Sequence, residues 1–153
     1  MTTTVKTTRK INGVDIERLT QSVAAINADP SLARFRFRAS NRWTGGATNH
    51  AESAGFYGAG EEVAHPTTFS ARCDEPHALL GDDTAPNPVE HLLFALSGCI
   101  TTSIAAHAAS RGIEIKSIES TLEGDIDVRG FLGLADHVER GYQEIRVTVK
   151  VET

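Results

Sequence analysis

The stretch NPVEHLLFALSGCITTSIAAHAASRG, residues 87–112, decides the fold. Asn87 is a favourable N-cap residue, the proline that follows suits the first helical position, and Glu90 occupies the carboxylate place of a capping box. Gly112 is a typical stop at the C-terminal end of a helix. Between them few residues are charged, and apolar or small residues lie on every side. We therefore predict a long helix over residues 88–111 that is buried nearly all round.

Alternating patterns on both sides of this helix predict strands. In RFRFRAS, residues 34–40, the phenylalanines face one way and the arginines the other, which indicates a half-buried strand. YQEIRVTVKVET, residues 142–153, alternates most cleanly. Weaker patterns predict further strands at residues 49–57, 66–73 and 113–127. The fold class is α+β, with mostly antiparallel sheets wrapped against one central helix.

The remaining segments complete a single domain over residues 1–153. Residues 1–34 form an N-terminal tail and helix: residues 1–10 are expected to be frayed, and a helix over 15–28 starts at the N-cap Asp15. Turn formers predict a turn at 44–48, a loop at 74–87, and a long loop or short irregular excursion at 127–141.

Composition excludes several classes of protein. A net charge of −5 argues against a nucleic-acid or anionic-membrane partner held by bulk charge. The N-terminus lacks a signal-peptide pattern, and no apolar run approaches the roughly 18 residues of a membrane span. We therefore expect a cytoplasmic protein without a membrane partner. Its two cysteines, Cys73 and Cys99, lack the spacing of a structural zinc site, and the six histidines form no metal motif.

The predicted central helix has more apolar surface than one small sheet can bury. A helix that is apolar on all sides needs neighbours on all sides, whereas a single small sheet covers only one. The chain also stops directly after its best strand. Both features predict that a second copy of the chain supplies the missing cover in a homodimer.

Several segments resemble the OsmC/Ohr family of thiol peroxidases over roughly residues 35–152. They are the DEP loop from residue 74, the helix start at NPVE, the LLFALSGC helix, the RGI that follows it, and GYQEIRV near the end. The N-terminal helix resembles an extension found in one branch. The resemblance implies an intertwined homodimer with two active sites at its interface. It also implies that a cysteine thiolate, without metal or organic cofactor, reduces organic hydroperoxides or hydrogen peroxide and becomes a sulfenic acid.

Cys99 matches the peroxidatic cysteine of that family. The nucleophile is the thiolate, and Cys99 lies about 16 Å from the helix start, which is too far for the helix dipole to stabilise it. A cation must therefore approach, and arginine suits because it stays charged when desolvated. Arg72 in SARCDEP is the closest match to the family's catalytic arginine, and Arg42 in NRW is the second candidate. The alternative for Cys99 is a small buried hydrophobe.

Two family features differ here. The glutamate that directly follows the helix-start proline is replaced by Val89, and Glu90 comes one residue later. Glu90 lies about 13 Å along the helix from Cys99 and on nearly the opposite side, so it acts only through an arginine or across the dimer, unless it serves as a cap alone. The resolving cysteine lies in a C-terminal helix that this sequence lacks, through truncation or because it is a one-cysteine form.

The second cysteine is not expected to replace the resolving one. Cys73 neighbours Arg72 on a predicted strand, so their side chains point to opposite faces. An external thiol would then reduce the sulfenic acid. The side of the helix that bears Cys99 is apolar with two hydroxyls, and aromatic residues are candidate walls of a pocket that suits alkyl or fatty-acid hydroperoxides, or else are dimer core. The residues concerned are Leu92, Ala95, Leu96, Thr102, Ser103 and Ala106, with Trp43, Phe56, Tyr57 and Phe131.

The leading hypothesis is therefore a thiol-dependent peroxidase that reduces organic hydroperoxides through Cys99. The competing hypothesis is a non-enzymatic dimer that binds small apolar ligands or senses redox state on the same fold, with a site weakened by Val89. A third is a structural fragment of a longer protein.

Overall fold

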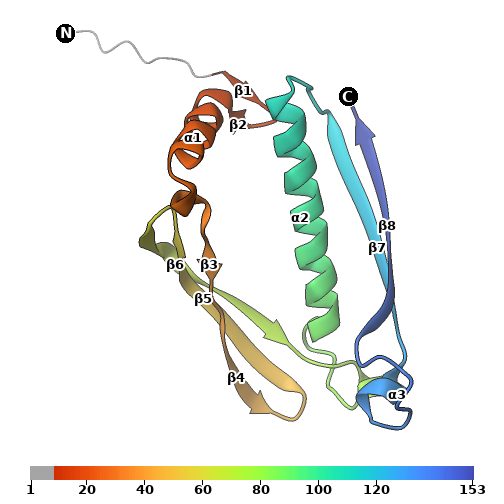
Figure 1. The fold of residues 1–153 in the computed structure, drawn as a ribbon. Helices are drawn as coiled ribbons and strands as arrows, with labels where there is room; N and C mark the ends of the chain where they lie inside the picture. Colours follow the sequence, from red (N-terminus) through yellow and green to blue (C-terminus); the bar gives the residue numbers. More distant parts are fainter. Residues whose placement is uncertain (1–8) are drawn as a thin grey trace, which may run out of the picture. The chain divides into compact units, whose positions relative to one another are not determined.

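The computed structural model describes residues 9–153, and most of the expected tail, residues 1–8, lies outside them. Its elements are drawn in Figure 1. The chain forms two compact units, one containing Asp15–His91 and the other containing Lys10–Val14 and Leu92–Thr153. Helices and antiparallel sheets are both present, which confirms the α+β class. A single domain remains a prediction.

The first unit begins with the predicted N-terminal helix. Helix α1 spans Ile16–Ala28, and Asp15 caps it by accepting a hydrogen bond from the Arg18 backbone N–H at 3.0 Å. The helix ends at Asp29, because the next residue is a proline, and a short 3₁₀ helix, η1, follows at Pro30–Ala33. The N-cap and the end of this helix are confirmed.

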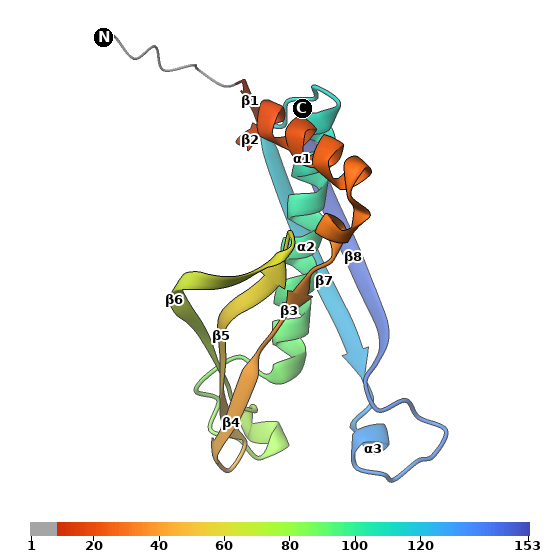
Figure 2. The ribbon, with the colours of Figure 1, turned by 60° about the vertical axis from the view of Figure 1, so that its left-hand side comes forward.

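A four-stranded antiparallel sheet makes up the rest of the first unit. Strand β5, Thr48–Gly58, lies in the middle (Figure 2). Strand β6, Glu61–Cys73, pairs with one edge of β5, and β3, Arg36–Phe37, and β4, Ser40–Gly45, pair with the other. The predicted turn at 44–48 is confirmed as the connection from β4 to β5.

The RFRFRAS prediction is right about alternation and wrong about burial. Phe37 pairs with Phe56 and Arg36 with Tyr57, so the phenylalanine and the arginine face opposite sides. The regular strand is only two residues long, however, and Phe37 is 73% exposed. The strand is therefore not half-buried within one chain.

The β5–β6 pairing bends at Gly55, where the register shifts. A Cβ atom at this position would lie 2.5 Å from the Val63 carbonyl oxygen, so only glycine lets the two strands approach so closely.

The second unit contains a hairpin that the sequence pattern did not predict. Strands β1, Lys10–Ile11, and β2, Val14–Asp15, pair around Asn12. The Asn12 side chain donates to the Ile113 carbonyl oxygen at 3.0 Å and accepts from the Ile115 backbone N–H at 2.8 Å. The expectation that residues 1–10 are frayed is thus wrong at Lys10, because this asparagine ties the hairpin to the chain after the long helix.

The long helix and the last strands confirm the predicted elements of the second half. Helix α2 spans Pro88–Ser110, and β7, Ser117–Ile126, pairs antiparallel with β8, Tyr142–Glu152. A short helix, α3, at Val128–Phe131 interrupts the loop between these strands.

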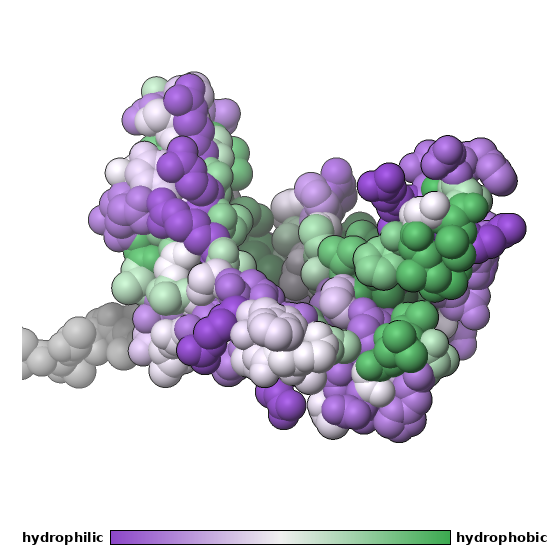
Figure 3. All heavy atoms as spheres, turned by 90° about the horizontal axis from the view of Figure 1, so that it is seen from below, coloured by the Kyte–Doolittle hydropathy of each residue, from purple (hydrophilic) through white to green (hydrophobic). Residues whose placement is uncertain are grey.

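The burial of the α2 side chains differs more from the prediction than any other feature of the single chain. Of α2 only Ala109 is buried, while Leu92 is 60% and Phe94 57% exposed. Among the described residues, Ala109 and Ile11 are the buried hydrophobic ones. Figure 3 shows apolar side chains lying open on the surface. The prediction of a helix buried nearly all round is therefore wrong for one chain by itself.

One further expectation about α2 is wrong. Its 23 residues are long enough to cross a membrane, and a window of 18 of them has a mean hydropathy of 1.6, which is apolar enough by composition. The sequence pattern predicted no such run. The difference arises because small, weakly polar residues such as Ser97 and Thr102 interrupt the apolar run without lowering its average far. Core helices of soluble proteins meet the same criterion.

Candidate functional site

Cys99 lies within α2, eleven residues after the first helical residue, and its side chain is exposed. Apart from its chain neighbours and the backbone of the helix itself, the residue before it, Gly98, has no atom within 4 Å of the place where a Cβ would stand, so the helix surface beside Cys99 is open in the single chain. One turn later, the Thr102 hydroxyl donates to the Gly98 carbonyl oxygen at 2.9 Å. The alternative role of Cys99, that of a small buried hydrophobe, therefore does not hold within the single chain.

The two candidate arginines lie in one row of the sheet. Arg42 on β4 pairs with His50 on β5, and His50 pairs with Arg72 on β6. Directly opposed residues of an antiparallel sheet point to the same face, so the three side chains share one face. Both arginines are exposed and His50 is half-buried. The sequence motifs present Arg42 and Arg72 as alternatives, whereas the strand register puts them in one row.

The end of β6 is held by the first turn of α2. His91 Nε2 donates to the Arg72 carbonyl oxygen at 2.9 Å. This bond fixes the backbone at Arg72 while leaving its guanidinium group uninvolved. The sequence signal for this role of His91, a lone histidine in the first helical turn, was too weak to identify it.

Cys73 lies on the other face of the sheet, as predicted from its place beside Arg72. It pairs with Asn49, which in turn pairs with Trp43. Burial raises the pKa of the Cys73 thiol, and the nearby Glu75 carboxylate raises it further. Cys73 is therefore kept in the less nucleophilic thiol form.

The DEP loop is organised by a buried carboxylate. Asp74 is 1% exposed and accepts hydrogen bonds from the Thr84 hydroxyl at 2.7 Å, the Thr84 backbone N–H at 3.0 Å and the Glu75 backbone N–H at 2.8 Å. The bonds from Thr84, with that from Glu75, lower the pKa of Asp74 to about 2, although burial opposes the shift. The loop thus closes on Asp74, a role that the sequence pattern did not reveal.

Gly81 allows the same loop to fold tightly. A Cβ at this position would lie 1.9 Å from the Glu75 carbonyl oxygen, which is impossible for any other residue without rearrangement. The short 3₁₀ helix η2, His77–Leu79, precedes it. The loop that joins β6 to α2 is therefore a closed, hydrogen-bonded segment.

Glu90 forms the predicted capping box. Its carboxylate accepts from the Asn87 backbone N–H, and the Asn87 side chain accepts from the Glu90 backbone N–H, each at 2.8 Å. The cap is confirmed, and it occupies one carboxylate oxygen of Glu90. A catalytic role for Glu90 stays a prediction.

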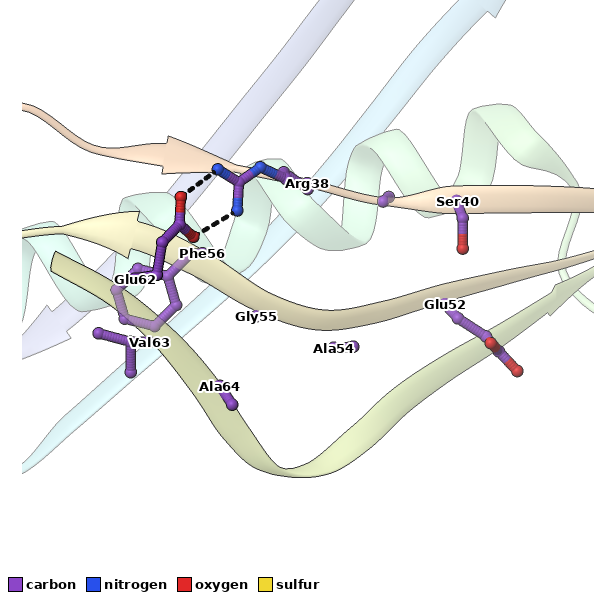
Figure 4. Close-up of a pocket in the computed structure, with 10 residues that line it drawn as sticks. Arg38, Ser40, Glu52, Ala54, Gly55, Phe56, Glu62, Val63 and Ala64 are labelled. Atoms are coloured by element: carbon purple, nitrogen blue, oxygen red, sulfur yellow. Dashed lines mark hydrogen bonds and ion pairs between the residues drawn. The ribbon is translucent and has the colours of Figure 1, made fainter.

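Two cavities lie on the sheet of the first unit. The larger, of about 650 Å³, opens where the sheet bends, and the Arg38 guanidinium forms a two-point ion pair with Glu62 at its rim (Figure 4). The smaller, of about 260 Å³, lies beside Arg42 and His50. The larger is lined by Arg38, Ala39, Ser40, Glu52, Ala54, Gly55, Phe56, Glu62, Val63 and Ala64.

Of the residues predicted to line a pocket, one lines a cavity and others are exposed. Phe56 lines the larger cavity, while Leu92 on α2 and Phe131 on α3 are 60% and 75% exposed. Whether these side chains line a pocket beside Cys99 stays a prediction. Among residues 9–153, no three histidine, cysteine or acidic side chains lie close enough together to hold a metal ion.

Comparison with known proteins identifies the second half of the chain. A family model described as "OsmC-like protein" matches residues 81–153, which include all of α2, Cys99 and the β7–β8 pair. Arg42 and Arg72 precede the matched residues. No curated protein matches the chain.

Proposed function

The chain belongs to the OsmC-like family, and we propose that it is a thiol-dependent peroxidase that reduces organic hydroperoxides at Cys99. The observation that carries the proposal is an exposed cysteine, beside an open helix surface in the single chain, on the long helix that the family model matches. Peroxide chemistry needs such access because the oxygen must approach the sulfur directly.

The reaction follows from thiolate chemistry. The Cys99 thiolate attacks the distal peroxide oxygen, the O–O bond breaks, and the departing alkoxide takes a proton to leave as the alcohol. Cys99 becomes a sulfenic acid. An external thiol then condenses with the sulfenic acid to release water and form a mixed disulfide, and a second thiol reduces this disulfide and restores Cys99.

An arginine of the sheet row supplies the positive charge for this chemistry. The guanidinium group stays charged when desolvated and offers several donors, which suits both a thiolate and a departing alkoxide. Arg72 and Arg42 are both candidates, and the sheet register puts them on one face. Glu90 acts as the helix cap and is not needed as a proton donor or acceptor.

Two copies of the chain form the working protein. The α2 residues Leu92 and Phe94 are more than half exposed, and among the described residues Ile11 and Ala109 are the buried hydrophobic ones. Burying apolar surface stabilises by about 25 cal/mol per Å², and obligate dimers bury about 2,000 to 5,000 Å². A homodimer in the cytoplasm, rather than a membrane, is the proposed cover of α2.

The reductant comes from outside the described chain. Cys73 faces away from Arg72, and its pKa is raised, so it is a poor partner for the sulfenic acid. A dithiol or a low-molecular-weight thiol is therefore the proposed reductant.

One observation favours the competing hypothesis. The family's glutamate position holds Val89, and the carboxylate of Glu90 is engaged by the Asn87 backbone. A dimeric binder of apolar ligands or a redox sensor needs no such glutamate.

A trapping experiment separates these two functions. Reduced protein is mixed with cumene hydroperoxide and a sulfenic-acid trap, and the modified residue is located by mass spectrometry. A peroxidase gives trapped Cys99 and turns over when dithiothreitol is added, Cys73→Ser behaves in the same way, and Cys99→Ser is inactive. A binder gives no turnover, and a sensor is oxidised once without turnover.

A further inference from the structure

Two hydrogen bonds join the end of β6 to the start of α2. The Asp74 backbone N–H donates to the Pro86 carbonyl oxygen at 3.4 Å and closes the neck of the loop between these elements. His91 Nε2 donates to the Arg72 carbonyl oxygen at 2.9 Å. The end of the strand and the first turn of the helix therefore lie side by side (Figure 1), and the arginine backbone is attached to the helix that carries Cys99.

This attachment holds a segment of β6 that has little other support. The register of β6 against β5 shifts in the middle, so that residues 65–68 of β6 stand opposite a single residue of β5. The segment beyond this interruption, residues 69–73, is short and carries Arg72 near its end. Among the described strands β6 pairs with β5 alone. The bond from His91 is therefore the anchor of this segment on the side away from β5.

The second candidate arginine lies on the opposite edge of the same sheet. Arg42 is on β4, which pairs with β5 on the edge that β6 does not occupy. The bond from His91 acts on Arg72 directly, whereas it reaches Arg42 only through two strand pairings. The start of α2 thus sets the backbone position of one candidate arginine and not of the other.

We propose that His91 is a positioning residue, which holds the Arg72 backbone at the start of α2 so that the guanidinium group stabilises the Cys99 thiolate. Cys99 lies eight residues after His91, about 12 Å along the same helix, so His91 acts through the arginine and not on that sulfur. That an arginine stabilises this thiolate rests on the proposed function. The bond assigns the role to Arg72 rather than to Arg42.

The chemistry of the bond decides which substitutions keep it. Glutamine carries an amide N–H the same number of bonds from Cα as the histidine Nε2, so His91→Gln can still donate to the Arg72 carbonyl oxygen. Asparagine is one bond shorter, and alanine has no donor. His77 is a matched control, because its Nδ1 donates to the Gly81 carbonyl oxygen, also at 2.9 Å, within the loop between β6 and α2.

Alkylation of Cys99 by iodoacetamide tests the inference, because its rate follows the fraction of thiolate. The full chain with Cys73→Ser is the background, and peptide mass spectrometry follows the reaction between about pH 5 and pH 9. His91→Ala should slow alkylation at pH 7 about tenfold and move the pH–rate profile to higher pH, and His91→Asn should do the same. His91→Gln and His77→Ala should stay within about twofold of the background.

A double-mutant cycle shows whether His91 acts through Arg72. In the Arg72→Gln background His91→Ala should have no further effect, because the group that it positions is gone. In the Arg42→Gln background it should keep its full effect. The inference is overturned by an equal loss in both backgrounds, by no loss in His91→Ala, or by a loss in His91→Gln as large as that in His91→Ala.

Circular dichroism establishes that each variant is folded. If His91→Ala does not fold, the comparison of His91→Gln with His91→Asn carries the same test, and equal rates in these two overturn the inference. The proposed function is tested separately, because iodoacetamide is not a peroxide. The expected cycle without peroxide turnover refutes only the peroxidase, and turnover without the expected cycle refutes only the role of His91.

Discussion

Asn87 and Glu90 each accept the other's backbone N–H through their side chains, at 2.8 Å in both directions. This reciprocal pair fixes the residue at which α2 begins. Because the helix then runs without interruption to Ser110, the pair also fixes the position of Cys99 along the helix and the side to which it points. The start of the helix and the reactive cysteine are thus set by one local feature.

The capping pair predicts how Glu90 responds to substitution. Glutamine keeps the capping geometry and removes the charge, so Glu90→Gln should retain peroxidase activity within about twofold of the wild type. Asn87→Ala removes the cap and should lower the free energy of unfolding by about 1 kcal/mol, measured by urea denaturation. A large loss of activity in folded Glu90→Gln would instead show that its charge supports an arginine.

Asp74 predicts an acid-sensitive contribution to stability. Its pKa in the folded protein, about 2, lies below the ordinary value of 3.8, so its stabilisation is complete above about pH 4 and is lost as the pH falls toward 2. Asp74→Asn should therefore have a lower melting temperature than the wild type at pH 6. The difference in melting temperature between the wild type and Asp74→Asn should become smaller between pH 4 and pH 2, as measured by thermal unfolding followed by circular dichroism.

A matched control isolates the buried carboxylate from general surface charge. Asp136→Asn changes the same chemical group on the loop between α3 and β8 and should leave the acid dependence of the wild type unchanged. A gap between wild type and Asp74→Asn that stays constant down to pH 2 would show that Asp74 does not titrate in this way.

The exposed side of α2 predicts a dimer that a single charge disrupts. Leu92 is 60% exposed in one chain, and burying a leucine side chain contributes about 1.5 to 3 kcal/mol. Light scattering should give twice the 16.4 kDa mass of one chain for the wild type and a monomer or aggregate for Leu92→Glu. Gln21→Glu, on the exposed surface of α1, should stay dimeric. A monomeric wild type would rule out the proposal that a second copy of the chain covers α2.

The two thiols predict an order of reactivity. Burial and the Glu75 carboxylate raise the pKa of Cys73, so iodoacetamide at pH 7.5 should modify Cys99 first, as followed by peptide mass spectrometry. Cys73→Ser should react with peroxide as fast as the wild type. Modification of Cys73 before Cys99 would contradict the assignment of the two roles.

Local patterns in the sequence predicted the elements well. The caps at Asp15 and at Asn87 with Glu90, and the alternation in the final strand, depend on neighbouring residues alone, and all three are confirmed. The β1–β2 hairpin could not be predicted, because its strands are two residues long and depend on Asn12, whose hydrogen-bond partners lie about a hundred residues away in the sequence. No periodicity reveals such a contact.

The candidate site was predictable only in part. Sequence pattern and resemblance singled out Cys99, Arg42 and Arg72, but the grouping of the arginines around His50 depends on the pairing of three strands with a register shift. The loop around Asp74 depends on Thr84, ten residues away, and on a close backbone approach at Gly81. Burial of α2 could not be predicted for one chain, because it depends on what covers the helix.

The reaction of Cys99 with one equivalent of cumene hydroperoxide is the sharpest test of the proposed peroxidase function. In the Cys73→Ser protein, the loss of the thiol and the formation of cumyl alcohol are followed together by rapid quench. A peroxidase should form one alcohol per Cys99, with a second-order rate at least about 100-fold above that of free N-acetylcysteine at the same pH, which corresponds to about 2.7 kcal/mol of activation free energy. A rate equal to that of the free thiol would show that Cys99 is not a peroxidatic cysteine.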